Sequence, residues 1–457
     1  MKDKSGFPFG PRRVVWELLL EGGDFPTRRF SRAVEDAGLE SADRGLAREL
    51  LAGVLRTQGT LDRIAIAFCS KQLKDPKLAL ALRIGIYQLL YMDRVPSHAA
   101  IDTTLRAVRP EVPAKISFLN AVLRAVSRGS NVGQKDDRPA MHSMVSPAWR
   151  FNRRVFTNPD KDAMRYLAET TSYPNFLVKR WLEDVGEEAT RERLAALNKP
   201  AALWLRVNTQ RADIDTVRTK LLDFGVEFAE DENAQALPML RVLPSKQRAP
   251  IPSWPGFEQG EWAVQDLTSY RSLAFGQPKA GMRILDLCAA PGGKSFAAME
   301  MSGGKAEIVA CDINGSRLET MHEEAGRLGH DLTIRTIAED GSDLPEGPWD
   351  LILCDVPCSN TGVLNKRPEA RWRFSKLELH RLETIQNLFR KKLLLPSLTD
   401  NTQILWTTCS LEPEENLQAA QRVAKHGNRR VAESILFEPS REQAGGFAAL
   451  LDLPTPE

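Results

Sequence analysis

The 457-residue chain carries 62 Lys and Arg against 60 Asp and Glu residues, a formal net charge of +2, with 42% apolar residues and six cysteines. This apolar content can offset the entropy of ordering the chain, which excludes extensive disorder, and the length predicts two or three domains. No stretch reaches the roughly 18 consecutive apolar residues of a membrane span, and the first residues lack a signal-peptide core. We therefore expect a cytoplasmic protein without a membrane partner, whose cysteines are thiols.

The near-zero net charge conceals two unlike parts of the chain. Residues 1–140 contain 23 Lys and Arg against 16 Asp and Glu, a net charge of +7, and residues 141–457 carry a net charge of −5. One explanation is attraction of the first part to a polyanion such as RNA. The other is chance variation among solvated surface residues, and composition does not decide between the two.

The first third of the chain has helical patterning. Apolar residues recur at helical spacing from Pro11 to Ser127, which predicts an all-helical domain over residues 1–130. The stretch from Leu78 to Leu90 is apolar on nearly every side and is predicted to be the central helix. The segment from Arg128 to Arg138, rich in Gly, Ser, Asn and charge, indicates a linker, which we place at residues 131–145.

The rest of the chain divides into two patterns. Residues 146–270 mix predicted helices, such as Asn175–Trp181, with strands, such as Leu203–Val207, which indicates a small α+β domain. In residues 271–457, strands alternate with helices about every 20 to 30 residues, as in a parallel, doubly wound sheet.

A glycine-rich turn joins the first predicted strand of this sheet, Ile284–Cys288, to a helix. Such a turn lets a ligand approach the backbone at the carboxyl edge of the sheet. A Walker A phosphate loop would need glycine where Cys288 stands, and the G-x-G-x-x-G pattern of dinucleotide sites is missing. A nucleoside cofactor without a pyrophosphate remains, of which S-adenosylmethionine is the commonest.

Carboxylates follow the next two strands. Asp312 ends the strand Glu307–Asp312, about 20 residues after the glycines, where an acid can accept the ribose hydroxyls of a nucleoside. Asp340 follows the strand Leu332–Ile337 and is placed to meet an adenine amino group. One acid at a strand end is usually a cap or a turn residue, but three successive strand ends of this kind indicate a cofactor site.

Two cysteines follow the last two parallel strands. Cys358 comes after the strand Trp349–Asp355 and Cys409 after the strand Gln403–Thr408, so the two thiols are expected to converge at the cofactor edge. Zinc is disfavoured, because their spacing is not finger-like and the six histidines form no cluster with them. The other four cysteines are expected to be small buried hydrophobes. These are Cys69, Cys288, Cys311 and Cys354.

Thiols beside a methyl donor suggest methylation of a pyrimidine. Carbon 5 of the ring is too weak a nucleophile unaided, but addition of a thiolate to carbon 6 creates an enamine that attacks through carbon 5. Loss of the carbon-5 proton then expels the thiol, and Asp355 is a nearby carboxylate for the base. The target base must leave any stack to enter such a pocket. Spacing alone does not decide which cysteine attacks.

At these residues the chain resembles the bacterial RNA cytosine-C5 methyltransferases, most closely the 16S ribosomal RNA enzymes with a NusB-like N-terminal domain. The matching segments are VPSHAAID (95–102), FLNAVLRAVSR (118–128), SYPNFLVKRW (172–181), LWLRVNT (203–209), VQDLTSY (264–270), LDLCAAPGGKS (285–295), ACD (310–312), DLILCDVPCSNTGVLNKRPEARW (350–372) and TTCSLEPEEN (407–416). The resemblance implies an all-α NusB-like RNA-binding domain, a small α+β intermediate RNA-binding domain and a Rossmann-like S-adenosylmethionine-dependent catalytic domain.

The resemblance also implies roles for single residues. Cys409 would be the nucleophile and Cys358 would assist product release, with Asp355 in the catalytic site. The implied contacts of S-adenosylmethionine are Cys288, Ala289, Ala290, Pro291, Gly292, Gly293, Lys294, Asp312, Asp340 and Asp355. The expected partner is RNA, 16S ribosomal RNA being favoured, with no metal and no implied oligomer. The alternatives are the same chemistry on transfer or another RNA, and a non-catalytic RNA-binding or ribosome assembly factor.

Three further segments carry expectations. A cluster of four residues is either a set of RNA contacts, by charge and stacking, or an exposed group beside a helix. Its members are Arg367, Arg371, Trp372 and Arg373. The family's usual Pro-Gly-Gly turn is replaced by Leu398–Thr402, where Asp-Asn can form a similar turn. Residues 445–451 fit a closing strand, and residues 454–457 a frayed tail.

Overall fold

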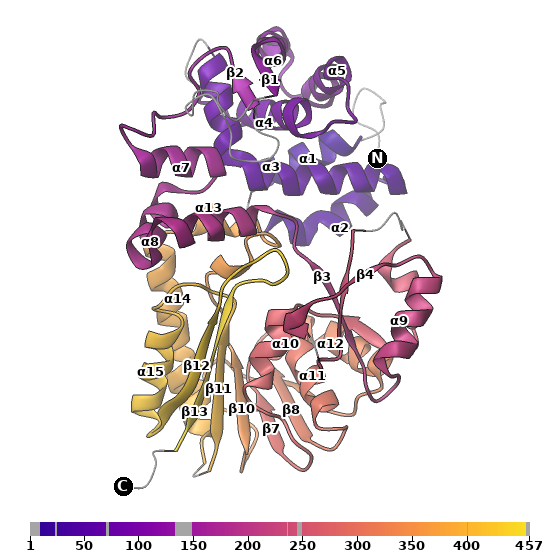
Figure 1. The fold of residues 1–457 in the computed structure, drawn as a ribbon, viewed down its shortest axis with the longest axis vertical. Coiled ribbons are helices and arrows are strands. Elements are labelled where there is room, and N and C mark those ends of the chain that lie inside the picture. Colours follow the sequence, from indigo (N-terminus) through magenta and orange to yellow (C-terminus); the bar gives the residue numbers. More distant parts are fainter. Residues whose placement is uncertain are drawn as a thin grey trace. The chain divides into compact units, whose positions relative to one another are not determined.

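The computed structural model describes residues 10–22, 25–69, 73–132, 149–234, 236–244, 249–399 and 401–453. It divides into two compact units. The first contains the chain up to Asn198 together with Leu364–Ser375, and the second contains Lys199–Val363 together with the chain from Lys376 onward. Figure 1 shows the helices of the first unit and the sheets of the second. A short segment from the C-terminal half of the sequence thus folds with the N-terminal unit.

The first unit is helical, as expected. Its main helices are α1 (Pro11–Glu21), α2 (Pro26–Asp36), α3 (Ser41–Phe68), α4 (Pro76–Tyr91), α5 (Ser97–Val108), α6 (Ile116–Gly129), α7 (Ala163–Thr171), α8 (Asn175–Asn198) and the short α13 (Ala370–Arg373). Helix α4 begins where Asp75 accepts a hydrogen bond from the backbone N–H of Lys77, with Pro76 at the first helical position. Helix α8 contains a kink at Gly186, whose φ is 78°.

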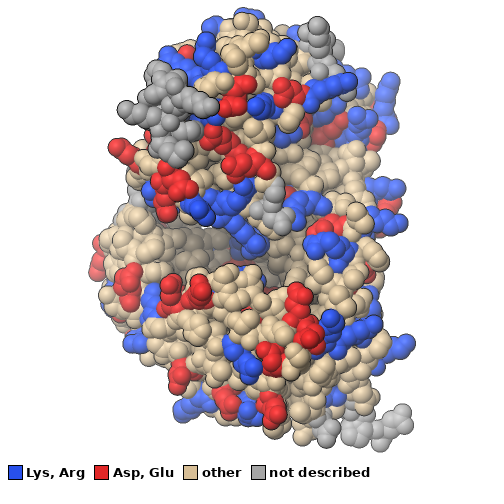
Figure 2. Space-filling model, turned by 180° about the vertical axis from the view of Figure 1, so that it is seen from behind, with Lys and Arg blue, Asp and Glu red and all other residues tan. Residues whose placement is uncertain are grey.

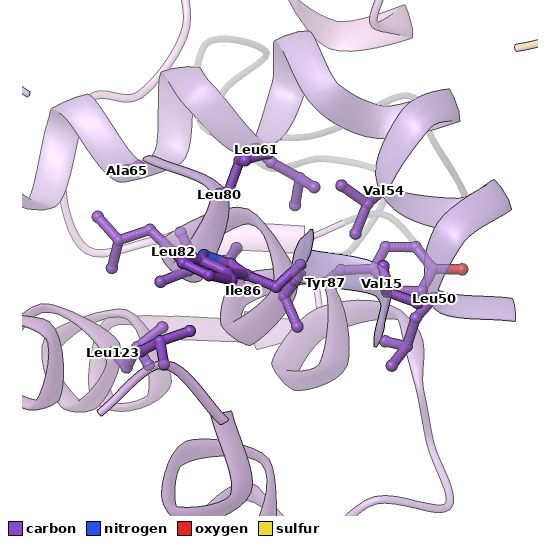
Figure 3. Close-up of a cluster of buried hydrophobic side chains, with 14 of the residues drawn as sticks. Val15, Leu50, Val54, Leu61, Ala65, Leu80, Leu82, Ile86, Tyr87 and Leu123 are labelled. Carbon is purple, nitrogen blue, oxygen red and sulfur yellow. The ribbon is translucent and has the colours of Figure 1, made fainter. Parts of the chain in front are cut away.

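Helix α4 is the centre of this unit, as its all-round apolar sequence predicts. Leu82 and Ile86 are both fully buried, and they lie among side chains from α1, α3 and α6 (Figure 3). Gly53 of α3 makes room for the ring of Tyr87, because a Cβ at Gly53 would lie 2.0 Å from the Tyr87 Cζ atom. The Tyr87 hydroxyl donates a 2.5 Å hydrogen bond to Glu49, which fixes the ring against α3.

The segment Leu364–Ser375 is anchored in the first unit by Arg371. The Arg371 side chain is fully buried, and its guanidinium donates to the carbonyl oxygens of Arg56 and Ser172, each at 3.2 Å, and to Asn198 Oδ1 at 2.8 Å. The indole N–H of Trp372 donates to the Leu55 carbonyl. Both interpretations of Arg371, as an RNA contact and as an exposed residue beside a helix, are therefore wrong, because the side chain is buried and donates to oxygen atoms of the protein.

The predicted linker begins with regular structure. Arg128 and Gly129 end α6, and β1 (Ser130–Val132) pairs antiparallel with β2 (Trp149–Phe151). Residues 133–148 lie outside the described part of the chain. The β1–β2 pair joins the two sides of the linker segment, so the residues after it, up to Asn198, group with the helical unit.

The second unit begins with a four-stranded antiparallel sheet. Its strands are β3 (Leu203–Val207), β4 (Phe228–Ala229), β5 (Met239–Val242) and β6 (Trp262–Val264), in the order β4-β5-β3-β6. Helix α9 (Ile214–Asp223) packs on it, with Val217 and Leu221 buried against Trp262. This is the α+β pattern predicted from the sequence.

A seven-stranded sheet completes the second unit. Its strands are β7 (Arg283–Asp286), β8 (Glu307–Asp312), β9 (Thr333–Thr336), β10 (Leu351–Asp355), β11 (Gln403–Thr408), β12 (Arg430–Phe437) and β13 (Gly446–Asp452). The order is β12-β13-β11-β10-β7-β8-β9. Five strands are parallel, but β13 pairs antiparallel with both β11 and β12, so the prediction of a wholly parallel sheet is wrong at this edge. The polar alternation of β12, which lies at the sheet edge, gave no buried-strand signal.

Alternate strand residues point to opposite faces of this sheet. Ile352 packs with Phe389 of α14 (Lys376–Phe389) and Val423 of α15 (Leu417–His426). Its neighbour Leu353 belongs to the opposite core, formed with α10 (Leu267–Ala274) and α11 (Gly293–Met301). Helix α12 (Gly315–Leu328) follows β8. Both faces are covered, as a buried parallel sheet requires.

Two expectations concern residues outside the described chain, namely the tail 454–457 and Asp400 of the Asp-Asn turn. Among the described residues, none of the helices combines the length and the apolar character needed to cross a membrane.

Replacing Gly53 by Ala should destabilise the helical unit by about 1–3 kcal/mol, because the added methyl group must displace the hydrogen-bonded ring of Tyr87. The matched control is Gly45→Ala on the same helix, where nothing lies within 4 Å of the added Cβ. That change should stabilise the helix by about 0.5–1 kcal/mol. Urea unfolding followed by circular dichroism measures both, and equal effects of the two changes would contradict this packing.

Candidate active site

Two neighbouring parallel strands bring the two predicted cysteines together. Strands β10 and β11 pair with Asp355 opposite Thr407, so the loops that leave them start at the same sheet edge. The sulfur atoms of Cys358 and Cys409 lie 3.2 Å apart, as the expected convergence requires. Asn360 connects the two loops, because its side-chain oxygen faces the Cys409 sulfur at 3.4 Å and its amide donates to the Cys358 carbonyl.

A lysine–carboxylate pair lies at the same edge. The Lys294 ammonium is 2.7 Å from a carboxylate oxygen of Asp355, whose other oxygen accepts from the Thr407 hydroxyl. Burial alone would lower the pKa of Lys294, but the ion pair with Asp355 outweighs it and the pKa is raised. Cys409 also acts electrostatically on this lysine. A cationic ammonium at this place favours a nearby thiolate.

The glycine loop lies between β7 and α11. Gly292 has a φ of 103°, and a Cβ there would lie 2.5 Å from the ring of Phe296, so glycine is required. Asp286 anchors both ends of the loop, accepting from the Ser295 hydroxyl at 2.7 Å and from the Cys288 N–H at 3.2 Å. Burial raises the pKa of Asp286 to about 6, although these hydrogen bonds oppose the shift.

The two other predicted acids differ in their surroundings. Asp312 is buried at the end of β8, and its carboxylate accepts from the N–H groups of Ala290 and Asn314. Asp312 therefore borders the glycine loop. Asp340 is exposed in a turn after β9, where its carboxylate accepts from the Ser342 N–H and hydrogen bonding holds its pKa below the usual value. A role of Asp340 beside an adenine stays a prediction.

Five of the cysteines have raised pKa values, among them Cys69 of the helical unit, whose pKa is raised by burial. Burial raises the pKa of Cys288 and of Cys354 well above the ordinary thiol value, and that of Cys311 to about 12. For Cys358 the hydrogen bond with Cys409 is the largest cause, followed by burial, and its pKa is also well above the ordinary value. Cys358 is therefore held as a thiol next to the Cys409 sulfur.

A buried arginine supports the glycine loop from the four-stranded sheet. Arg206 of β3 is 1% exposed and makes a two-pronged ion pair with Glu300 of α11, at 2.8 and 2.9 Å. The same guanidinium donates to the Gly293 carbonyl at 3.0 Å, which also accepts from the Gln265 amide. His330 lies 3.0 Å from Glu300. Arg206, Gln265 and Glu300 were not predicted, because the residues that they connect are far apart in the sequence.

The arrangement places two sulfur atoms and a carboxylate beside the glycine loop, the groups that covalent addition to a ring needs. Within the described part of the chain, no group of three or more His, Cys, Asp and Glu side chains is placed to hold a metal ion.

On the face drawn in Figure 2, Lys and Arg side chains form several separate groups with Asp and Glu between them.

Replacing Arg206 by Ala should destabilise the second unit by about 3–5 kcal/mol, because the buried Glu300 carboxylate loses its two-pronged partner. The control is Lys220→Ala, which breaks a 2.6 Å pair with Glu261 at a site where the lysine is 44% exposed, and should cost less than about 1 kcal/mol. Guanidinium unfolding measures both. If the free energy of unfolding falls no more for Arg206→Ala than for the control, the buried pair does not hold β3 to α11.

Models of three protein families match successive parts of the chain. The NusB family matches residues 18–128, a ferredoxin-like domain of RsmF/B-like methyltransferases matches residues 173–242, and the 16S rRNA methyltransferase RsmB/F matches residues 274–456. Among solved structures, that of PH0851 has a TM-score of 0.75 at 22% identity and covers 97% of this chain and 98% of that one. A methyltransferase homolog from Pyrococcus horikoshii has a TM-score of 0.55 at 22% identity, covering 64% and 99%. These two structures share the fold.

The curated relatives are closer in sequence. A ribosomal RNA small subunit methyltransferase B from Shigella sonnei is 31% identical over 423 residues, which cover 89% of this chain and 89% of the relative. The protein of the same name from Pasteurella multocida is 31% identical over 418 residues, covering 88% and 83%. The family that the sequence motifs resemble is thereby confirmed, and the chain belongs to the RsmB/F family of 16S rRNA methyltransferases.

Proposed function

We propose that this protein transfers a methyl group from S-adenosylmethionine to carbon 5 of a cytosine in RNA, with 16S ribosomal RNA as the substrate. The observation that carries the proposal is the Cys358–Cys409 pair, 3.2 Å apart, beside the Lys294–Asp355 ion pair. Two thiols and a carboxylate are what carbon-5 methylation through a covalent adduct needs. The names of the curated relatives support ribosomal RNA as the substrate.

The residues around the glycine loop fit the cofactor. A backbone without side chains at Gly292 and Gly293, flanked by the carboxylates of Asp312 and Asp355, suits a cationic nucleoside with a free ribose. When bound, this cofactor supplies an electrophilic methyl group. The residues proposed to hold it are Cys288, Ala289, Ala290, Pro291, Gly292, Gly293, Lys294, Asp312, Asp340 and Asp355.

In this proposal the protein's residues act on the flipped cytosine. The Cys409 thiolate, favoured by the Lys294 ammonium, bonds to carbon 6, and carbon 5 takes the methyl group. Removal of the carbon-5 proton, with Asp355 as the nearby carboxylate, restores the double bond and expels the Cys409 thiolate. Cys358, held as a thiol at the Cys409 sulfur, assists this release. The charge of Lys294, which acts on Cys409, favours attack by Cys409 over attack by Cys358.

Replacing Cys409 by Ala should abolish methyl transfer, because no thiolate remains to activate carbon 5. Methyl transfer is measured as incorporation of a radiolabelled methyl group into unmodified 16S ribosomal RNA. The control is Cys69→Ala, at a cysteine of the helical unit. Methylation by Cys409→Ala at the wild-type rate would refute the assignment of the nucleophile.

Replacing Cys358 by Ala should leave Cys409 able to attack and slow its release. The expected product is an enzyme–RNA adduct that survives denaturing electrophoresis and disappears in the Cys358→Ala/Cys409→Ala double variant. If Cys358→Ala forms no adduct and turns over normally, product release does not depend on this thiol.

Bisulfite sequencing of RNA from a deletion strain identifies the substrate. The proposal expects loss of a 5-methylcytosine in 16S ribosomal RNA. Loss of methylation only in transfer RNA would support the cytosine-C5 chemistry but identify transfer RNA as the substrate. No loss in any RNA would favour a non-catalytic assembly factor.

A further inference from the structure

Behind the two cysteines lies a buried carboxylate that the proposed chemistry does not use. Glu415 belongs to the turn between β11 and α15 and is completely buried. One of its oxygens accepts from the Ser359 N–H at 2.9 Å. The other accepts from the hydroxyls of Ser359 at 2.5 Å and Ser410 at 2.6 Å. The carboxylate thus accepts hydrogen bonds from three donor groups of two separate loops, and the Gln386 amide of α14 is a fourth donor at 3.5 Å.

Each of these serines directly follows a cysteine. Ser359 comes after Cys358 and Ser410 after Cys409, and the two loops are 51 residues apart in the sequence. The serine hydroxyls also contact one another at 3.0 Å. Fixing both serines therefore fixes the backbone that carries both sulfur atoms. Glu415 binds a residue of each loop, in addition to the direct bond from the Gly362 N–H to the Cys409 carbonyl.

The turn that carries Glu415 is itself held in place. The Trp406 indole N–H donates to the Glu415 carbonyl at 3.1 Å, and Thr408 donates to the Asn416 side chain at 2.5 Å. Asn416 in turn donates to the Ser410 carbonyl. The carboxylate is thus attached to strand β11 on one side and to the loop after Cys409 on the other, so it has little freedom to follow a moving loop.

Burying an acid is unfavourable, and packing alone does not need one. Burial raises the pKa of Glu415 to about 7, while the Ser359 and Ser410 hydrogen bonds lower it and Glu412 raises it. Its charge also contributes to the raised pKa of Cys358. A buried acid is unfavourable as mere filling of the core, but one that accepts hydrogen bonds from donors in two loops holds those loops together.

We propose that Glu415 is a positioning residue, which clamps the Cys358 and Cys409 loops so that the two sulfur atoms meet at one reacting ring. The clamp itself is a property of the free protein. Its effect on methyl transfer rests on the proposed function, since a displacement of about 1 Å in a reacting group costs about 10²-fold in rate.

A reagent that needs two adjacent thiols tests the clamp without any substrate. Phenylarsine oxide forms two As–S bonds and releases one water molecule, so it binds tightly only where two sulfurs are within reach. Glu415→Ala should weaken its binding to the full-length protein at least about tenfold. Glu415→Gln keeps an acceptor for the Ser359 N–H and should stay within about threefold of wild type. Cys409→Ser gives the background from the other cysteines.

The matched control is Glu414→Ala, the preceding and only partly buried acid of the same turn, which should leave the affinity for phenylarsine oxide unchanged. Wild-type affinity in a folded Glu415→Ala protein would overturn the clamp. If Glu415→Ala does not fold, the Ser359→Ala/Ser410→Ala variant removes both hydroxyl donors, and undiminished binding there would overturn the proposal equally.

Steady-state kinetics then tests the consequence for catalysis. Glu415→Ala should lower kcat about 10²-fold while the KM for S-adenosylmethionine stays near the wild-type value, with partial rescue by Glu415→Gln. An equal change in kcat and KM would indicate general disruption and contradict a positioning role. If wild type methylates no RNA while the arsenical results hold, the proposed function fails and the clamp stands.

Discussion

The parallel pairing of β10 and β11 is the constraint on which the site depends. Backbone hydrogen bonds set Asp355 opposite Thr407, so the chain leaves both strands at one edge and two thiols meet there. Parallel strands end on the same side, and the groups beyond their carboxyl ends share one crevice. The antiparallel β13 pairs with the other side of β11, which makes β11 an interior strand of the sheet.

The glycine loop is held from two directions. Asp286 fixes it from the strand below, and Arg206 with Gln265 holds the Gly293 carbonyl from the smaller sheet. A loop without side chains has many conformations, so its shape has to come from partners outside it. The ferredoxin-like region thus contributes to the shape of the loop, besides any contact with RNA.

The protonation of Lys294 and Cys358 depends on their neighbours. Lys294 keeps its proton because Asp355 is its partner, and Cys358 keeps its proton because Cys409 is beside it. At both residues, a neighbouring group sets the direction in which the pKa is shifted. The same rule accounts for Arg371, whose charge suggested a nucleic-acid contact but whose burial among carbonyls makes it an anchor of the helical unit.

The sequence by itself determined the helical and α/β patterns, the glycine loop, the acid at the end of β8 and the two cysteines, because periodicity and strand-end motifs are local properties. Only the tertiary structure decided the antiparallel edge at β12 and β13, the joining of Leu364–Ser375 to the first unit, and the burial of Arg206, Arg371 and Glu415. These features depend on pairs of residues distant in the chain. The sequence does not show whether a charged side chain faces water or a buried partner. Only the packing in the tertiary structure distinguishes an exposed charge from a buried one.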